Sequence, residues 1–230
     1  MTSLGIIVAA AGLSRRFGDF PKLLELLQGK PLFCHCLLTF TDAFPEARIA
    51  VAVPATLLER FREAAAACLP NTALPRILFV VGGDSRTESV RLAMEALLAH
   101  GAAPTFLAVH DAARPYCTAA TLQRCLEALT ADGSLNGVIA GRPCTDTIHT
   151  VDAAGLLTGT PPRVSLRAAE TPQVFRTEAL LCAYAAYAAK PSLPLPTDEA
   201  DLVLRAGPCR LAVVVPDEAN PKVTYAADLP

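Results

Sequence analysis

The sequence predicts an α/β fold in which a mostly parallel sheet is flanked by helices. Short, unbroken apolar runs alternate along the chain with longer segments of helical character. Such runs are typical of strands buried on both faces of a parallel sheet. Polar loops that contain glycine follow several of these runs directly. Because ligands of such folds bind at the carboxyl ends of the strands, these loops are the first candidates for a site.

The expected elements follow one another in a regular order. We expect strands at 5–10, 49–53, 77–81, 106–109, 137–140 and 211–215. We expect helices at 31–43, 55–69, 86–99, 119–131 and 176–189. Prolines mark several boundaries: Pro31 opens the first helix and Pro54 stops the second strand. A last short helix begins within 197–200, where Thr197 is expected to be the N-cap, ahead of two acidic residues.

The alternation breaks between residues 141 and 172. This stretch holds four prolines and short runs rich in Thr, Val and Ile, and nothing in it predicts a helix. A connection of this length in a compact domain is usually functional or an interaction element. We interpret it as a β-hairpin excursion from one domain that spans residues 1–230.

Composition limits the classes of function. The net charge is −2, which argues against a general nucleic-acid binder, so an anion site must be built from local cations. No apolar run approaches the length of a membrane span. A strand begins almost at the first residue, which leaves no room for a cleavable signal. We therefore expect a cytoplasmic protein that binds neither nucleic acid nor a membrane.

Eight cysteines are scattered along the chain without a CxxC pair, so neither a redox dithiol nor a zinc knuckle is predicted. Cys34-His35-Cys36 is the one close group. It lies within the first expected helix, where adjacent side chains point in different directions and cannot converge on one metal ion. Buried thiols in a reducing compartment are the better interpretation.

The first polar loop, residues 9–22, is the strongest candidate for an anion site. It follows the first strand and combines two glycines with Arg15, Arg16 and Lys22. Small residues let backbone N–H groups approach an anion, and Arg and Lys neutralise its charge. The loop matches neither G-x-x-x-x-G-K-[ST] nor G-x-G-x-x-G. The alternative is an ordinary loop whose arginines face the solvent.

Two further loops lie at the same expected edge of the sheet. Residues 82–89, GGDSRTES, follow the third strand, and residues 110–115, HDAARP, follow the fourth. Asp111 is suited to Mg²⁺ and Arg114 to a phosphate group. The alternative is a buried structural pair between the two. His110 is expected to be a packing residue.

These motifs together resemble the 2-C-methyl-D-erythritol 4-phosphate cytidylyltransferase family. The matching segments occur in family order and span nearly the whole chain: AAAGLSRRF with PK, GGDSRTESV, VHDAARP, the pair Asp146-Thr147, TPQVF, TDEA and NPKVT. The resemblance implies a Rossmann-like nucleotidyltransferase fold with a protruding β-arm that builds a homodimer. It also implies that CTP and methylerythritol phosphate give the CDP-alcohol and pyrophosphate, with Mg²⁺ as cofactor.

The resemblance also assigns roles to individual residues. It implies a catalytic set that stabilises the transition state, made of Arg16, Lys22 and Lys222. It implies nucleotide contacts from Ala10, Ala11, Gly12, Gly82, Gly83, Asp84 and Ser89. It implies contacts to the polyol phosphate from Asp111, Arg114, Thr147, Arg163 and Thr197, with Asp111 also facing the metal.

Several positions depart from the family pattern. Ser14 replaces a usual glycine, and the spacing from Arg16 to Lys22 is one residue short. Arg167 stands at the usual tryptophan position and Pro221 at an apolar one. Because both lie near the expected acceptor pocket, a cytidylyltransferase for another polyol phosphate, such as ribitol 5-phosphate, is an alternative. A nucleotide-binding regulator without turnover is another. In some bacteria a cyclodiphosphate synthase domain is fused after this point, so a first half of such a fusion is also compatible.

Overall fold

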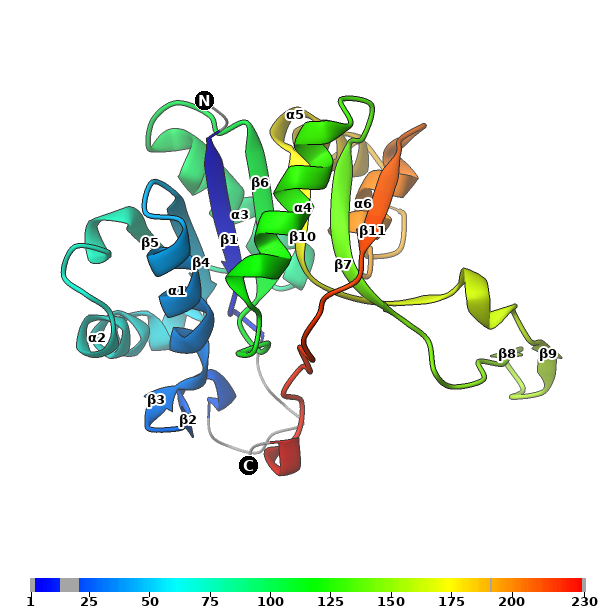
Figure 1. Cartoon of the computed structure of the whole chain (residues 1–230), viewed down its shortest axis with the longest axis horizontal. Coiled ribbons are helices and arrows are strands. Elements are labelled where there is room, and N and C mark those ends of the chain that lie inside the picture. The colour runs from blue at the N-terminus through cyan, green and yellow to red at the C-terminus, as the bar shows by residue number, and fades with distance from the viewer. Residues whose placement is uncertain (1–2, 13–20, 191, 229–230) are drawn as a thin grey trace.

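The computed structural model describes residues 3–12, 21–190 and 192–228. Within them the chain forms a sheet of seven strands in the order β11-β7-β10-β6-β1-β4-β5 (Figure 1). The bounds of these strands are β1 Leu4–Ala9, β4 Arg48–Val53, β5 Ile77–Val81, β6 Phe106–Asp111, β7 Gly137–Pro143, β10 Arg167–Arg176 and β11 Leu211–Val214. Only β10 runs antiparallel to its two neighbours in this sheet, β6 and β7. The mostly parallel sheet predicted from the sequence is therefore confirmed.

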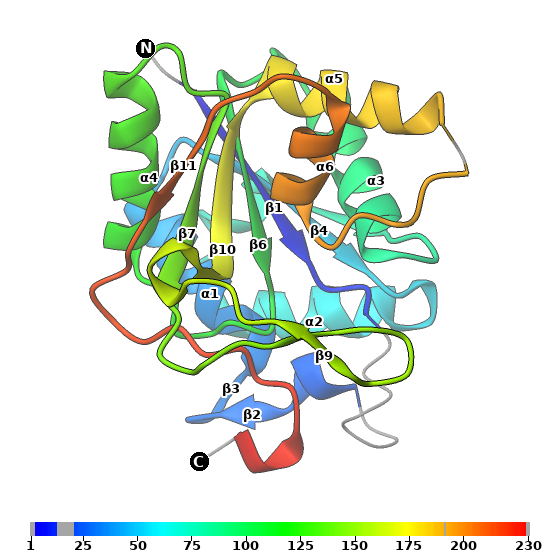
Figure 2. The same cartoon turned by 90° about the vertical axis from the view of Figure 1, so that its right-hand side faces the viewer.

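Helices cover both faces of the sheet. Their bounds are α1 Leu32–Ala43, α2 Leu58–Cys68, α3 Arg86–Ala99, α4 Ala119–Ala131, α5 Thr177–Ala188 and α6 Glu199–Ala206. Helices α1, α2 and α4 lie on one face of the sheet and α3, α5 and α6 on the other (Figure 2). Each group of helices contributes side chains to a separate hydrophobic core. In β1, Ile6 and Val8 enter the first core while Ile7 enters the second, because successive strand residues point to opposite faces. Strand β1 is thus buried on both sides, as its unbroken apolar sequence predicts.

The excursion is shorter than the sequence predicted. Residues 141–143 extend β7, and 167–172 belong to β10, so the projecting arm comprises residues 144–166. The arm carries a small antiparallel pair, β8 Thr150–Val151 and β9 Leu157–Gly159, and one 3-10 turn. It extends well away from the sheet (Figure 1). The two ends of the predicted excursion belong to the main sheet, because polar side chains of β10 find partners in the interior.

Smaller differences concern the ends of elements. Strand β6 continues to Asp111, two residues past the expected end. Helix α6 is capped by Asp198, whose side chain accepts the N–H of Asp201, so the prediction of Thr197 as N-cap was wrong. Thr197 instead donates its N–H and hydroxyl to the Asp201 carboxylate. A short hairpin of β2 Leu26–Leu27 and β3 Lys30–Pro31 was not predicted.

Candidate active site

A pocket of about 900 Å³ lies at the carboxyl ends of β1 and β6 and beside the start of α3. Segments that are distant in sequence meet there: the end of β1, residues 22–23, the loop after β5, the end of β6 and the C-terminal segment. The lining residues are Ala9, Ala11, Gly12, Lys22, Leu23, Gly83, Asp84, Ser85, Arg86, Ser89, Asp111, Ala113, Lys222 and Thr224. The three polar loops predicted from the sequence therefore contribute to one site.

The two glycines of the second loop are required by close packing. A Cβ on Gly82 would lie 2.3 Å from the Cβ of Ala11, and one on Gly83 would lie 2.1 Å from Cγ of Glu88. The Ser89 hydroxyl accepts the N–H of Gly83 at 3.1 Å and lies 2.8 Å from the carbonyl of Ser85. This packing brings the loop close to the end of β1 and directs the N-terminus of α3 at the pocket, where an anion would be stabilised.

Asp111 is the centre of the charged network. Its Oδ1 accepts a hydrogen bond from Nε of Arg86 at 3.0 Å, and its Oδ2 accepts one from Nζ of Lys222 at 2.8 Å. Burial alone would raise the pKa of Asp111, but the charges of Arg86 and Lys222 outweigh it and hold that pKa well below its usual range. Asp111 is therefore a carboxylate at neutral pH.

Arg86 is also held from its other side. Its Nη1 donates to Oε2 of Glu199 at 2.7 Å, and only 1% of the Glu199 side chain is exposed. The hydroxyl of Tyr184 lies 3.3 Å from Oε1 of the same carboxyl group. Burial raises the pKa of Glu199, although Arg86 acts in the opposite direction. Arg86 and Glu199 lie in the GGDSRTESV and TDEA motifs, but the sequence predicted no role for either residue. No local pattern indicates that positions so far apart form a pair.

Behind Asp111 lies a chain of hydrogen bonds. The N–H of Asp111 donates to the hydroxyl of Thr171, which lies 3.0 Å from Nδ1 of His110. Nε2 of His110 lies 3.1 Å from the carbonyl of Arg114. A carbonyl only accepts, which assigns the ring proton to Nε2 and makes Nδ1 an acceptor. Complete burial lowers the pKa of His110 to about 4, so the ring is neutral and structural, as predicted.

Two lysines meet at the C-terminal segment. Lys22 donates from Nζ to the carbonyl of Val223 at 2.8 Å, and Lys222 reaches Asp111. Lys22 is buried while Lys222 is about half exposed. The C-terminal segment thus contributes one cation directly and supports a second.

Eight of the residues assigned from the resemblance line the pocket: Ala11, Gly12, Lys22, Gly83, Asp84, Ser89, Asp111 and Lys222. Ala10 and Gly82 are not among the lining residues but adjoin Ala11 and Gly83, which are, and their N–H groups donate to the carbonyls of Ala52 and Val53. Arg16 lies outside the described residues.

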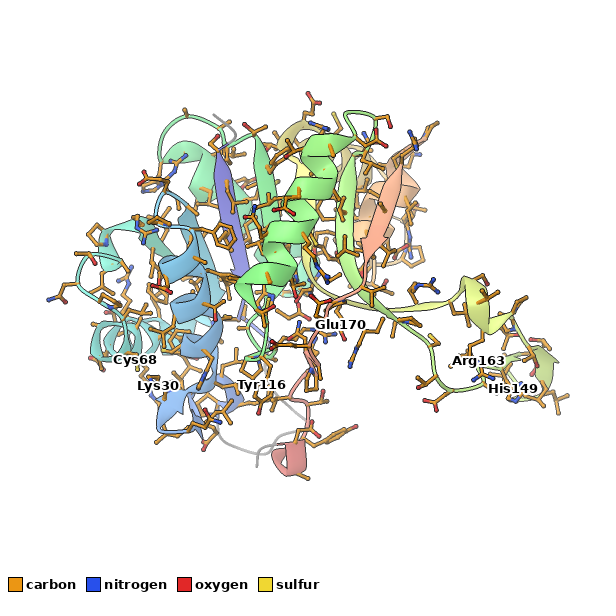
Figure 3. The ribbon with its side chains drawn as sticks, viewed as in Figure 1. Lys30, Cys68, Tyr116, His149, Arg163 and Glu170 are labelled. Atoms are coloured by element: carbon orange, nitrogen blue, oxygen red, sulfur yellow. The ribbon has the colours of Figure 1, made fainter. Side chains whose placement is uncertain are left out.

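The remaining assigned residues do not line the pocket of their own chain. Arg114 donates its guanidinium hydrogens to the carbonyls of Asn220 and Ala169. Thr197 is exposed and bonded to Asp201. Thr147 and Arg163 belong to the arm, and Figure 3 shows Arg163 near its far end. A role for these two arm residues in catalysis therefore requires a site outside their own domain.

The described residues contain no group of three or more His, Cys, Asp or Glu side chains that could hold a metal ion. Asp111 lies at the base of the pocket with both oxygens directed at cations. Mg²⁺ commonly takes only one or two protein carboxylates and completes its shell with water and substrate phosphates. Each Asp111 oxygen has a second lone pair, so the residue fits such a role.

Comparison with known proteins identifies the family of the chain. The family model described as 2-C-methyl-D-erythritol 4-phosphate cytidylyltransferase matches residues 4–230. The protein of that name from Cereibacter sphaeroides is 38% identical over 233 aligned residues, which cover 99% of this chain and 94% of the relative. The chain belongs to this family.

Solved structures of the cytidylyltransferase family share the fold. The enzyme of Thermus thermophilus superposes with a TM-score of 0.72 at 28% identity, with 100% of this chain and 96% of that chain covered. The Francisella tularensis enzyme gives a TM-score of 0.79 at 25% identity, with coverage of 99% and 97%. Among the described residues, no helix is long and apolar enough to cross a membrane.

Proposed function

We propose that this cytidylyltransferase transfers a cytidylyl group from CTP to 2-C-methyl-D-erythritol 4-phosphate, a step of non-mevalonate isoprenoid biosynthesis. The observation that carries the proposal is the pairing of Arg86 and Lys222 with Asp111 at the sheet edge, in a pocket that Lys22 also lines. A phosphate oxygen of the acceptor attacks the α-phosphorus of CTP. The bond from that phosphorus to the bridging oxygen breaks, and pyrophosphate leaves.

This reaction requires alignment and charge neutralisation more than a nucleophilic side chain. Lys22 and Lys222 stand where two anions must be held together, and Arg16 belongs to the same loop in sequence. Backbone N–H groups of Ala11 and Gly12 and the N-terminus of α3 supply further donors to phosphate oxygens. Charge that develops in the transition state is thus stabilised by groups fixed in advance.

We propose Mg²⁺ as the cofactor, held by Asp111 together with phosphate oxygens of CTP. The support is the ionised state of Asp111 and its place at the base of the pocket. When bound, the ion neutralises phosphate charge and favours departure of pyrophosphate. Lys222 keeps the carboxylate oriented through its 2.8 Å contact.

We further propose a homodimer in which the arm of one subunit completes the site of the other. The arm projects from its own domain and exposes apolar side chains: Val151 at 57%, Leu156 at 66%, Leu157 at 69% and Val164 at 82%. Exposed apolar groups concentrated on one projection are typical of an interaction surface. In a two-fold dimer each subunit gives the contact that it receives. Thr147 and Arg163 would reach the acceptor phosphate in this way.

The protein is proposed to act in the cytoplasm as one nucleotidyltransferase domain with an arm. All eight cysteines are free thiols, which fits a reducing compartment. Burial raises the pKa of Cys117 and of Cys125, the latter to about 12, so both are unreactive packing groups.

The test is release of pyrophosphate from CTP with each polyol phosphate in turn. Turnover with methylerythritol phosphate and little with ribitol 5-phosphate supports the proposal. Turnover mainly with ribitol 5-phosphate would identify that compound as the acceptor instead. CTP binding without any turnover would indicate a nucleotide-binding regulator.

A further inference from the structure

The C-terminal segment of residues 220–224, here called the lysine strap, carries Lys222 to the pocket. It also presents the Val223 carbonyl to Nζ of Lys22. The strap forms no helix or strand, so its path depends on side chains and single hydrogen bonds. The placement of both lysines is therefore linked to how the strap is anchored.

Asn220 is the buried anchor at the start of the strap, with 3% of its surface exposed. Its Nδ2 donates to the carbonyl of Thr171 in β10 at 2.8 Å. Its own carbonyl accepts from Nη1 of Arg114 at 2.7 Å. Farther along the strap, the N–H of Val223 donates to the carbonyl of Ala113 at 2.8 Å. Arg114, assigned to the substrate by resemblance, thus contacts the strap.

These contacts close a ring around the ion pair of the site. The carbonyl of Thr171 accepts a hydrogen bond from Nδ2 of Asn220, and its hydroxyl accepts one from the N–H of Asp111. Asp111 in turn accepts Lys222, which stands two residues after Asn220. Pro221 lies between these two strap residues and fixes one backbone angle, which restricts the path from the anchor to the lysine. Thr171 of β10 therefore contacts Asp111 directly and, through Asn220, helps to position Lys222.

We propose that Asn220 is a positioning residue: it sets where the ammonium of Lys222 stands in the pocket. The inference rests on the proposed cytidylyl transfer for its kinetic consequence. Loss of the Asn220 side chain frees the start of the strap while Asp111 keeps its bonds to Thr171 and Arg86. The lysine then samples several positions, and an error of about 1 Å in a catalytic group can cost roughly 100-fold in rate.

The experiment combines Asn220→Ala with Lys222→Ala in a double-mutant cycle. In the natural background Asn220→Ala should lower kcat by roughly 10–100-fold. In the Lys222→Ala background the same change should cost less than about threefold, because the group it positions is gone. Asn136→Ala is the matched control, because the side chain of Asn136 also holds a backbone group, the N–H of Arg210 at 2.9 Å. Asn136 precedes the first residue of β7, at the edge of the sheet opposite the pocket. This control should leave kcat unchanged.

An equal fold-loss in both backgrounds, or none in the natural one, would overturn the proposal. If Asn220→Ala does not fold, as judged by circular dichroism, Asn220→Leu removes the same donor at nearly constant size without adding a charge. A readout independent of turnover is acylation of Lys222 by an amine reagent, followed by peptide mass spectrometry. Release of Lys222 should raise its labelling rate several-fold over that in Asn136→Ala. Unchanged labelling contradicts positioning, whereas a natural enzyme without turnover contradicts only the proposed function.

Discussion

Nζ of Lys222 lies 2.8 Å from Oδ2 of Asp111, although 111 residues separate the two in sequence. This contact joins the C-terminal segment to the end of β6. It places a cation and an ionised carboxylate side by side at the base of the pocket. The positive charges of Lys222 and Arg86 balance the negative charge of Asp111 within the pocket.

Lys22→Ala should lower turnover much more than it weakens CTP binding. An interaction made mainly in the transition state acts on kcat, and the buried ammonium of Lys22 is placed for such a role. Steady-state kinetics and calorimetric CTP titration measure the two effects separately. Lys30→Ala, at an exposed lysine of the β3 strand, is the control and should change neither. An unchanged kcat with a raised Kd for CTP would make Lys22 a ground-state contact.

Removal of divalent metal should abolish activity, and Mg²⁺ should restore it. The reason is that Asp111 offers a hard-oxygen ligand, which suits an ion that completes its shell with phosphates and water. Turnover is measured after EDTA treatment and again after addition of excess Mg²⁺. Full activity in the chelator would contradict the assignment of Asp111 to a metal.

His110 should make the protein less stable as the pH falls from about 6.5 to about 4. Burial lowers the pKa of His110 from its ordinary 6.5 to about 4 in the folded state. Over that interval the unfolded chain binds a proton that the folded chain does not. The free energy of unfolding therefore decreases on acidification, by at most about 3 kcal/mol.

The measurement compares urea unfolding at several pH values in the natural protein and in His110→Gln. The amide can still contact Thr171 and Arg114, but it does not titrate. The difference between the two curves isolates His110, because other groups contribute equally to both. His149→Gln, at an exposed arm position, should follow the natural curve. Equal slopes for His110→Gln and the natural protein would show that His110 does not cause the pH dependence.

The sequence was sufficient for the parallel core and for much of the pocket. Unbroken runs such as Ile6-Ile7-Val8 are required by burial on both faces, and the strand ends that follow must meet at one edge. The ends of β10 and of the arm were harder to predict. Gln173 and Glu170 are polar yet buried, with partners in Asp198 and Arg142, and such a strand lacks the apolar run that identifies the others.

The site contacts that the sequence did not predict are pairs of residues that lie far apart in the chain. The contact of Arg86 with Glu199 spans 113 residues, and local patterns do not identify which acid meets which base. For the same reason, the TDEA motif indicated Thr197 as a substrate contact, whereas in the structure Glu199 of this motif joins the charged network. The direction in which the arm projects is likewise not encoded by any local pattern in residues 144–166.

Two inactive variants should restore activity when mixed, if the arm acts across the dimer. Lys22→Ala damages the body of the site, and Arg163→Ala damages the arm. In a mixed dimer one site then carries both defects and the other carries neither. Equal reassortment restores roughly a quarter of the natural sites. Subunit exchange is verified first by mass-tagged subunits; exchange without recovered activity would show that Arg163 does not act on the neighbouring site.

A competition between two acceptors tests the proposed reaction most directly. The protein is incubated with CTP, Mg²⁺ and equal concentrations of methylerythritol phosphate and ribitol 5-phosphate. The products are identified by mass spectrometry. We expect the CDP-methylerythritol product to dominate, with one pyrophosphate released per product formed. Predominance of CDP-ribitol, or no CDP-alcohol at all, would contradict it.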